Sequence, residues 1–401
     1  MVRSNPSQSP GAPPHDSSPC LDMIARVATR RRRLGTRQLG SSNHATLTQE
    51  CVADFLTTTA KCDVPSGLPG LVRLLAADGK RFQLVNGDLT AVRASNHAMN
   101  PFFVPIAKDA TKGSYIGYMR WPTQKPEMDL QIVETTEVGL KLLSLNTKSF
   151  CFRQLVEYDF NNYLEASGDN ARISKEAFAA WQLADYKEGD FLSFFSKLKA
   201  LSDKSSRDDK RVALDKYLLL RTNSSDGLSS SGGYPDCYER VASDFASKGN
   251  TISSLVTCEK AVNVFYSWGH PIAFHARLLQ RADGFTNEKE AVHCARASMR
   301  MPCWTTASTR LELQHLVSLA GFTSTDKLGE MHWMRSSDPR EKDVGEKGVS
   351  PQQVVLDQAA HVMDAVALGF AGKSFDAETK ALIASKYSEG GYPDIATFIL
   401  S

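Results

Sequence analysis

The sequence predicts a mostly α-helical protein, in which an irregular array of tetratricopeptide-like helical hairpins follows a small β-rich domain. Two observations support this prediction. Apolar residues recur with a period of two before Lys148 and with a period near 3.6 beyond it, as expected for strands and helices. In addition, glycine-containing turns join the helical segments of the second half. We therefore divide the chain into residues 1–49, a β-rich domain of residues 50–147 and a helical array of residues 148–401.

The composition is that of a globular protein in which charge is unevenly distributed. Of the 401 residues, 42% are hydrophobic and 23% are charged. No stretch approaches the roughly 20 apolar residues of a membrane-spanning helix. Residues 1–49 carry seven Arg and two Asp, a net +5, which leaves 40 basic and 43 acidic residues, or −3, for the body. Such a body has little electrostatic attraction for nucleic acid or anionic lipid.

The first 49 residues have the composition of an organelle transit peptide. They are rich in Arg, Ser and Pro, include the run Arg30–Arg33, and lack the continuous apolar stretch of a secretory signal. The alternative is a disordered basic tail, and the composition does not distinguish plastid from mitochondrion. The eight cysteines are scattered without a Cys-x-x-Cys pair, which is typical of reduced thiols in a stroma or a matrix.

The β-rich domain contains four segments that predict strands or hairpins. Within Arg81–Val92, the pair Asn86-Gly87 predicts a two-residue hairpin turn, because both of its positions need a positive φ. The segment Ser114–Trp121 predicts a strand with apolar side chains on both faces, and therefore a strand that is packed on both sides. The segments Leu130–Glu134 and Gly139–Leu145 would complete a small sheet.

Four turns of the second half combine a glycine that can end one helix with residues that can begin another. Glycine takes the left-handed conformation that closes a helix C-terminus, and Asp or Asn caps the helix that follows. The glycines are Gly189, Gly249, Gly284 and Gly390, and the caps are Asp190, Asn250 and Asn287. Each turn predicts an antiparallel hairpin, and hairpins in series are typical of an α-solenoid. The glycines lie 60, 35 and 106 residues apart, so the array has no fixed period.

Two more helices are expected near the end of the chain. Ser350, Pro351 and Gln353 form a capping box with proline at the first helical position. Gly369 would end this helix, and Asp376 would cap the next one.

The sequence predicts no catalytic, cofactor or metal site. The run Leu368–Ser374 resembles a phosphate-binding loop, but Ala367 stands where that loop needs glycine, and the run follows a helix instead of a strand. His293 and Cys294 are adjacent and diverge on a helix, and no second ligand pair complements them or Cys303. We therefore do not expect an enzyme.

Two dipeptides are the candidate contacts with a partner. Arg120-Trp121 and Cys303-Trp304 join large side chains to turn-forming neighbours, and Trp and Arg are favoured anchors of interfaces. We predict that Arg120, Trp121 and Trp304 bind a partner. The alternative is that both tryptophans fill a core.

Four segments resemble a family of nucleus-encoded plastid proteins of plants and algae that act in chloroplast ATPase biogenesis. They are Tyr115–Thr123, Tyr186–Phe191, Ala291–Trp304 and Val349–Ala360. The resemblance spans roughly Ser114–Leu400 and includes no functional signature, so it implies no site residues. It implies an auxiliary factor for assembly of the catalytic head of the chloroplast ATP synthase.

Together these observations predict a protein-binding scaffold of the chloroplast stroma that holds a client subunit, without a cofactor, nucleic acid or membrane span. Two other classes stay open. An organellar helical-repeat RNA-binding protein would need a basic concave face, and an enzyme would need a site that the sequence does not display. The mitochondrial matrix is the alternative location.

Overall fold

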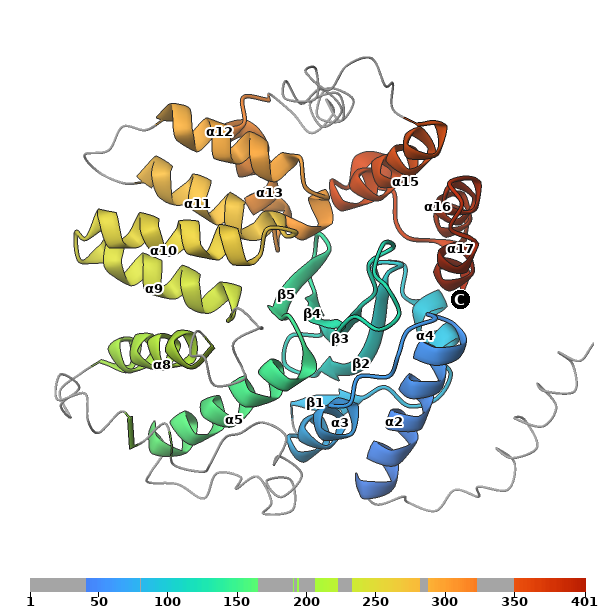
Figure 1. Ribbon diagram of the computed structural model, residues 1–401, viewed down its shortest axis with the longest axis horizontal. Coiled ribbons are helices and arrows are strands. Elements are labelled where there is room, and N and C mark those ends of the chain that lie inside the picture. The colour runs from blue at the N-terminus through green and yellow to red at the C-terminus, as the bar shows by residue number, and fades with distance from the viewer. Residues whose placement is uncertain are drawn as a thin grey trace, which may run out of the picture. The chain divides into compact units, whose positions relative to one another are not determined.

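The computed structural model describes residues 41–79, 81–164, 190, 193–194, 206–222, 233–281, 288–322 and 350–401. Ser41–Ser401 forms one compact unit. Helices predominate in it, and a small antiparallel sheet lies in its N-terminal part (Figure 1). The predicted fold class is therefore confirmed at this level, whereas the tetratricopeptide-like character of the hairpins stays a prediction. No helix in the described part of the chain is long and apolar enough to cross a membrane.

The sheet is a meander in which each strand pairs with the next one along the chain. Its order is β1-β2-β3-β4-β5, and all of its pairings are antiparallel. The strands are β1 (Phe82–Leu84), β2 (Phe103–Asp109), β3 (Tyr115–Met119), β4 (Gln131–Thr135) and β5 (Leu140–Ser144). The last three confirm the predicted strands. Ile116, Tyr118 and Met119 of β3 are all buried, as expected for a strand that is packed on both sides.

Four helices of the N-terminal part pack against this sheet. They are α2 (Ser41–Thr58), α3 (Leu68–Ala77), α4 (Leu89–Ser95) and α5 (Thr147–Leu164). Helix α2 lies across the boundary that we placed after residue 49, and Ala45 and Thr48 in its first half are buried. Thr48 also donates a hydrogen bond from Oγ1 to Oδ1 of Asn86 (2.6 Å). The folded part of the chain therefore begins before Glu50.

The hairpin predicted over Arg81–Val92 is wrong. Strand β1 pairs with β2 and not with the residues after Gly87, because those residues form α4. The carboxylate of Asp88 accepts a hydrogen bond from the amide of Thr90 and caps this helix. Gly87 does have a positive φ of 103°, but Asn86 does not, and a two-residue turn needs it at both positions.

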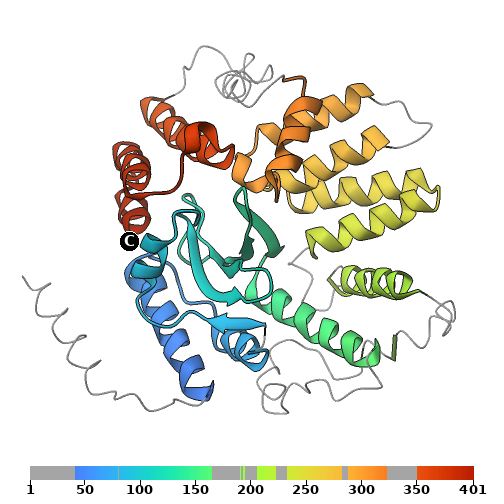
Figure 2. The ribbon, with the colours of Figure 1, turned by 180° about the vertical axis from the view of Figure 1, so that it is seen from behind.

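The second half of the unit is a series of helices packed on their neighbours (Figures 1 and 2). The turn at Gly249 confirms the prediction, since its φ is 75° and Asn250 accepts a hydrogen bond from the amide of Ser253. The turns around Gly189 and Gly284 and the cap Asn287 lie outside the described residues. The helices of this series are α8 (Arg207–Thr222), α9 (Pro235–Ser247), α10 (Thr251–Val264), α11 (Gly269–Arg281), α12 (Glu288–Met299), the 3-10 turn η2 (Cys303–Thr305) and α13 (Arg310–Leu319).

The last helices begin and end mostly as predicted. Ser350 caps α15 (Pro351–Ala367), Gly369 has a φ of 69°, and Asp376 caps α16 (Ala377–Glu389). The prediction for Gly390 is wrong, because its φ is −75° and Gly391 takes the left-handed conformation instead. Gly390 serves close packing: a Cβ there would lie 2.9 Å from the Leu356 side chain of α15.

The C-terminal helix α17 (Pro393–Leu400) returns to the N-terminal part of the unit, beside α2 and α4 (Figures 1 and 2). The rings of Phe398 and Phe55 lie 6.1 Å apart, edge to face. The buried guanidinium of Arg93 donates from Nη1 to the carbonyl of Phe398 (2.9 Å). These contacts connect the two ends of the compact unit through its core.

Candidate protein-binding groove

Arg120, which we predicted to bind a partner, lies in the core at the end of β3. Its side chain donates to the carbonyls of Ala60 (3.3 Å), Gln124 (2.6 Å) and Trp121. Only 5% of the residue is exposed. In the described structure this guanidinium therefore joins the segment after β3 to the segment after α2.

The structure brings the other two predicted residues together. The ring centroids of Trp121 and Trp304 lie 5.2 Å apart, and the ring of Trp268 lies 5.7 Å from that of Trp121. The indole Nε1 groups of Trp121 and Trp268 both donate to Oε1 of Gln131, at 2.9 and 3.0 Å. Trp268 and Trp304 are buried, whereas Trp121 is half-buried. We call these three rings and Gln131 the tryptophan cluster; sequence analysis missed Trp268 and Gln131.

Two glycines allow the chain to approach the tryptophan cluster closely. A Cβ on Gly139 would collide with the backbone of Trp304, and a Cβ on Gly269 would collide with Thr306. Gly269 is the first residue of α11, and Trp304 precedes α13 by a few residues. The cluster therefore sets where α11 and α13 start relative to the sheet.

Helices α9, α11 and α13, together with β5, line an open groove with a volume of about 700 Å³. We call it the α11 groove, because α11 contributes the most side chains to its lining. Phe274 and Leu278, one helical turn apart on α11, are half-buried. Leu311, in the first turn of α13, is 76% exposed. Phe274, Leu278 and Leu311 together give the groove a contiguous apolar surface, which is the kind of surface that a protein partner covers.

Charged side chains surround this apolar surface. Nδ1 of His270 lies 2.7 Å from Oε1 of Glu239, without a hydrogen bond to that oxygen, and Arg277 lies 3.9 Å from Glu312. Burial raises the pKa of Glu312, but the backbone amide of Ser308 and the guanidinium of Arg277 outweigh burial, so the pKa lies below its ordinary value. The groove therefore contains a carboxylate that is ionised at neutral pH and is held by the groove's own groups.

Two basic side chains of the groove have no ion-pair partner among the described residues. Lys141 of β5 and Arg281 of α11 form no side-chain hydrogen bond or ion pair with any residue that the structure describes. Lys141 acts at longer range, since its charge helps to lower the pKa of Asp236. Within the described part of the chain, nothing pairs with either cation, so each can pair with a carboxylate of a ligand.

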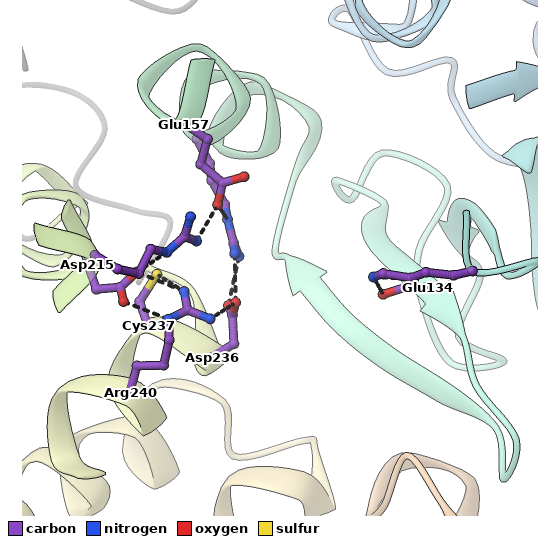
Figure 3. Close-up of polar contacts among 9 residues, drawn as sticks. Glu134, Glu157, Asp215, Asp236, Cys237 and Arg240 are labelled. Carbon is purple, nitrogen blue, oxygen red and sulfur yellow. Dashed lines mark hydrogen bonds and ion pairs between the residues drawn. The ribbon is translucent and has the colours of Figure 1, made fainter. Parts of the chain in front are cut away.

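A buried network of ion pairs fixes α9 against α5 and α8 (Figure 3). Arg153 of α5 contacts Glu157 (2.9 Å) and binds both carboxylate oxygens of Asp236 (2.7 and 2.6 Å). Arg240 of α9 contacts Asp236 (2.9 Å) and binds Asp215 through two nitrogens (2.6 and 2.7 Å). Although burial alone would raise the pKa of Asp236, these guanidiniums hold it well below its usual range. The network is structural: it gives the groove a rigid wall.

The groove offers binding chemistry. It combines apolar surface with charged groups of both signs, and no group of three or more His, Cys, Asp and Glu side chains in the described ranges could hold a metal ion.

The cysteine thiols Cys237 and Cys151 lie outside the lining of the groove. Both are buried, which raises their pKa well above the ordinary value. A raised pKa makes a thiol a poor nucleophile at neutral pH.

Sequence analysis missed the groove because its lining residues come from four elements that are far apart in the chain. Lys141 and His315 are separated by more than 170 positions, and no local pattern predicts that they share a surface. One weak signal exists. Leu311 follows Thr309, which caps α13, so a large apolar residue stands in the first turn of a helix, where it faces solvent.

The fold and this groove define a class of protein: helices packed on a small antiparallel sheet, with an open groove lined by apolar and charged side chains. Family models match most of this chain. The PAB N-terminal model matches residues 50–202, the PAB middle domain matches residues 235–323, and the PAB C-terminal domain matches residues 328–401. The chain therefore belongs to the PAB family, and this confirms the family resemblance noted in the sequence.

One relative has a descriptive name. The chain is 26% identical over 348 residues, 86% of this chain and 89% of the relative, to "Protein IN CHLOROPLAST ATPASE BIOGENESIS, chloroplastic" from Arabidopsis thaliana. No solved structure matches the chain. Helices α9, α11 and α13 all lie within the match to the PAB middle domain, and Lys141 lies within the match to the N-terminal model.

Proposed function

We propose that this protein is an assembly factor of the plastid, which holds a subunit of the catalytic head of the chloroplast ATP synthase while the head is assembled. The name of the Arabidopsis relative supports the process and the organelle. The α11 groove, with Leu311 76% exposed beside charged side chains, is the observation that supports binding of a protein client. The stroma is the proposed location, and residues 1–49 contain the proposed transit peptide.

In this proposal, the residues that we predicted to bind a partner have a mainly structural role. Arg120 and Trp304 are buried and do not need to touch the client: Arg120 joins the segments after α2 and β3, and Trp304 belongs to the tryptophan cluster from which α11 and α13 start. Trp121 is half-buried and can contribute to either role. A direct contact between these three residues and a client stays a prediction.

Retention of purified ATP synthase head subunits tests the proposal. The full chain would be immobilised and offered each head subunit separately at 50 and 200 mM salt, with and without nucleotide. We expect one subunit to be retained at both salt concentrations. The variant Leu311→Asp should weaken retention at least tenfold, because it puts a charge where the client buries apolar surface.

The matched control is Ile252→Asp. Ile252 is 70% exposed on α10 and does not line the groove, so the same chemical change there should leave retention unaffected. If no subunit is retained, the proposal fails. If both variants bind as well as the unmodified chain, the client binds elsewhere and the groove is not its site.

The RNA-binding alternative makes the opposite prediction. A protein that makes about six phosphate contacts loses affinity by about 10³ or more between 50 and 200 mM salt. Organelle RNA offered to the same immobilised chain would reveal such binding. Salt-sensitive retention of RNA, without retention of any subunit, would favour the alternative.

A further inference from the structure

We infer that the α11 groove selects a client segment in which large apolar residues stand beside carboxylates, that is, an acidic and apolar peptide segment of the client. This inference rests on the proposed function and specifies the partner chemistry of the same groove. It follows from the arrangement of side chains along α11 and from the balance of charges in the described lining of the groove.

Apolar and basic side chains share one face of α11. Phe274, Arg277, Leu278 and Arg281 all line the groove, at positions i, i+3, i+4 and i+7 of the helix. Residues at this spacing lie on one stripe of an α-helix. A segment that lies along α11 therefore meets apolar surface and guanidinium groups in alternation. Leu311 adds an exposed apolar side chain from the neighbouring α13.

The groove has an excess of positive charge, although residues 50–401 carry a formal −3. Three cations, Lys141, Arg277 and Arg281, face two carboxylates, those of Glu239 and Glu312. Both carboxylates already lie against groove residues, Glu239 beside His270 and Glu312 beside Arg277 and the amide of Ser308. The side chains of Lys141 and Arg281 form no hydrogen bond or ion pair with a described residue. The described lining of the groove therefore carries one more positive than negative charge.

Charge complementarity then decides which segment fits. Carboxylates of a client can pair with Arg281 and Lys141, and guanidinium groups bind carboxylates through two parallel hydrogen bonds. A basic segment would instead meet the excess positive charge of the described lining. A phosphate or a nucleic-acid backbone would satisfy the cations but would leave Phe274, Leu278 and Leu311 without apolar contact. The combination therefore favours a peptide with both features.

Labelled peptides test the inference. Overlapping peptides that cover the retained head subunit would first be screened for binding to the full chain by fluorescence anisotropy. The best binder would then be compared with two versions of itself, in which every Asp and Glu is replaced by Gln or by Lys. We expect the original peptide to bind at least tenfold more tightly than the Gln version, and the Lys version to bind least.

Reversing the charges of two groove side chains tests whether the peptide binds in the α11 groove. In the double variant Lys141→Glu with Arg281→Glu, the acidic peptide should bind at least tenfold more weakly, and the Lys version should bind more tightly than it does to the unmodified chain. Because the charge of Lys141 favours the ionised form of the buried Asp236, the double variant should melt at a somewhat lower temperature than the unmodified chain but stay folded. If it unfolds, the single variant Arg281→Gln provides the same comparison with a smaller expected effect.

The matched control reverses two exposed cations outside the groove, Arg73 of α3 and Lys260 of α10. Equal weakening by Arg73→Glu with Lys260→Glu would show that net charge, and not the groove, attracts the peptide, and would overturn the inference. Equal binding of the acidic and Lys peptides, while the intact subunit is still retained, would overturn the inference but leave the proposed function standing. If no subunit is retained, the proposed function fails first.

Discussion

Glycine at position 139 allows the turn between β4 and β5 to lie against the backbone of Trp304. The turn is held by its own hydrogen bonds, from the amide of Thr136 to the carbonyl of Gly139 (2.8 Å) and from the amide of Gly139 to Oγ1 of Thr136 (3.1 Å). Trp304 in turn contacts Trp121, and the amide of Cys303 donates to Oδ1 of the buried Asp364 (2.7 Å). At the residue scale, the sheet, η2 and α15 therefore meet at one close contact.

The variant Gly139→Ala should lower the free energy of unfolding by about 1–3 kcal/mol, because the added Cβ forces the turn and the Trp304 backbone apart. Urea unfolding of both proteins measures the difference. The control is Gly70→Ala in α3, where nothing lies within 4 Å of an added Cβ. That change should be neutral or stabilising, since alanine favours a helix over glycine. Similar losses in the two variants would contradict the close contact at Gly139.

Helix α16 is docked on the N-terminal part of the unit through a buried cation. Nζ of Lys380 donates to the carbonyl of Arg93 in α4 (2.7 Å), and the residue is only 8% exposed. Burial, and then the charge of Arg93, lower the pKa of Lys380 from 10.5 to about 8. The amide of Phe375, just before α16, also donates to the carbonyl of His97 (2.8 Å). At the element scale, the packing of α16 thus requires a lysine to lose much of its hydration.

This packing predicts a dependence of stability on pH. Below about pH 8, Lys380 is charged in both the folded and the unfolded chain, and the fold bears the cost of burying the charge. Between about pH 8 and 10.5 the unfolded chain binds more protons, so the contribution of Lys380 to stability rises with pH. The full gain is at most about 3 kcal/mol.

The comparison with Lys380→Met isolates this contribution, because buried tyrosines and cysteines destabilise both proteins alike as they ionise at high pH. We expect the unmodified chain to gain stability relative to the variant when denaturant unfolding is measured, with a reductant present, at pH 7 and again at pH 9.5. A constant difference between the two proteins at both pH values would show that Lys380 titrates normally in the fold.

The two ends of the compact unit stabilise each other. Phe398 of α17 packs on Phe55 of α2 and on the guanidinium of Arg93, whose carbon Cζ lies 4.4 Å from the Phe398 ring centroid. The start of α2 also contributes, since Thr48 is fully buried and bonds to Asn86. At the scale of the whole molecule, the helical array therefore does not end freely but closes against the N-terminal helices.

Truncation tests where this unit begins. A chain that starts at Ser41 should melt at the same temperature as the full chain, because residues 1–40 lie outside the compact unit. A chain that starts at Glu50 should melt several degrees lower, since it lacks the buried Ala45 and Thr48. The transit-peptide interpretation of residues 1–49 predicts instead that all of them are dispensable for folding. Equal melting temperatures of the two truncated chains would support a boundary after residue 49 over the start of the folded unit at α2.

The sequence alone determined the features that depend on neighbours within a few positions. The caps at Asn250, Ser350 and Asp376 and the strand Tyr115–Met119 could be predicted, because a helix start or a strand pattern is set by local hydrogen bonds and by the period of apolar side chains. The same local reasoning failed at Asn86-Gly87. The choice between a hairpin and a helix there depended on β2, which supplies the partner of β1 from a later part of the chain.

Tertiary structure decided everything that joins distant positions. Trp304 has the residue type of an interface anchor, but only the fold shows that it is 3% exposed against Trp121. The α11 groove exists because β5, α9, α11 and α13 are brought side by side, and its charge balance depends on which side chains these elements bring together. Burial and charge pairing are properties of neighbours in space, and sequence order does not encode these neighbours locally.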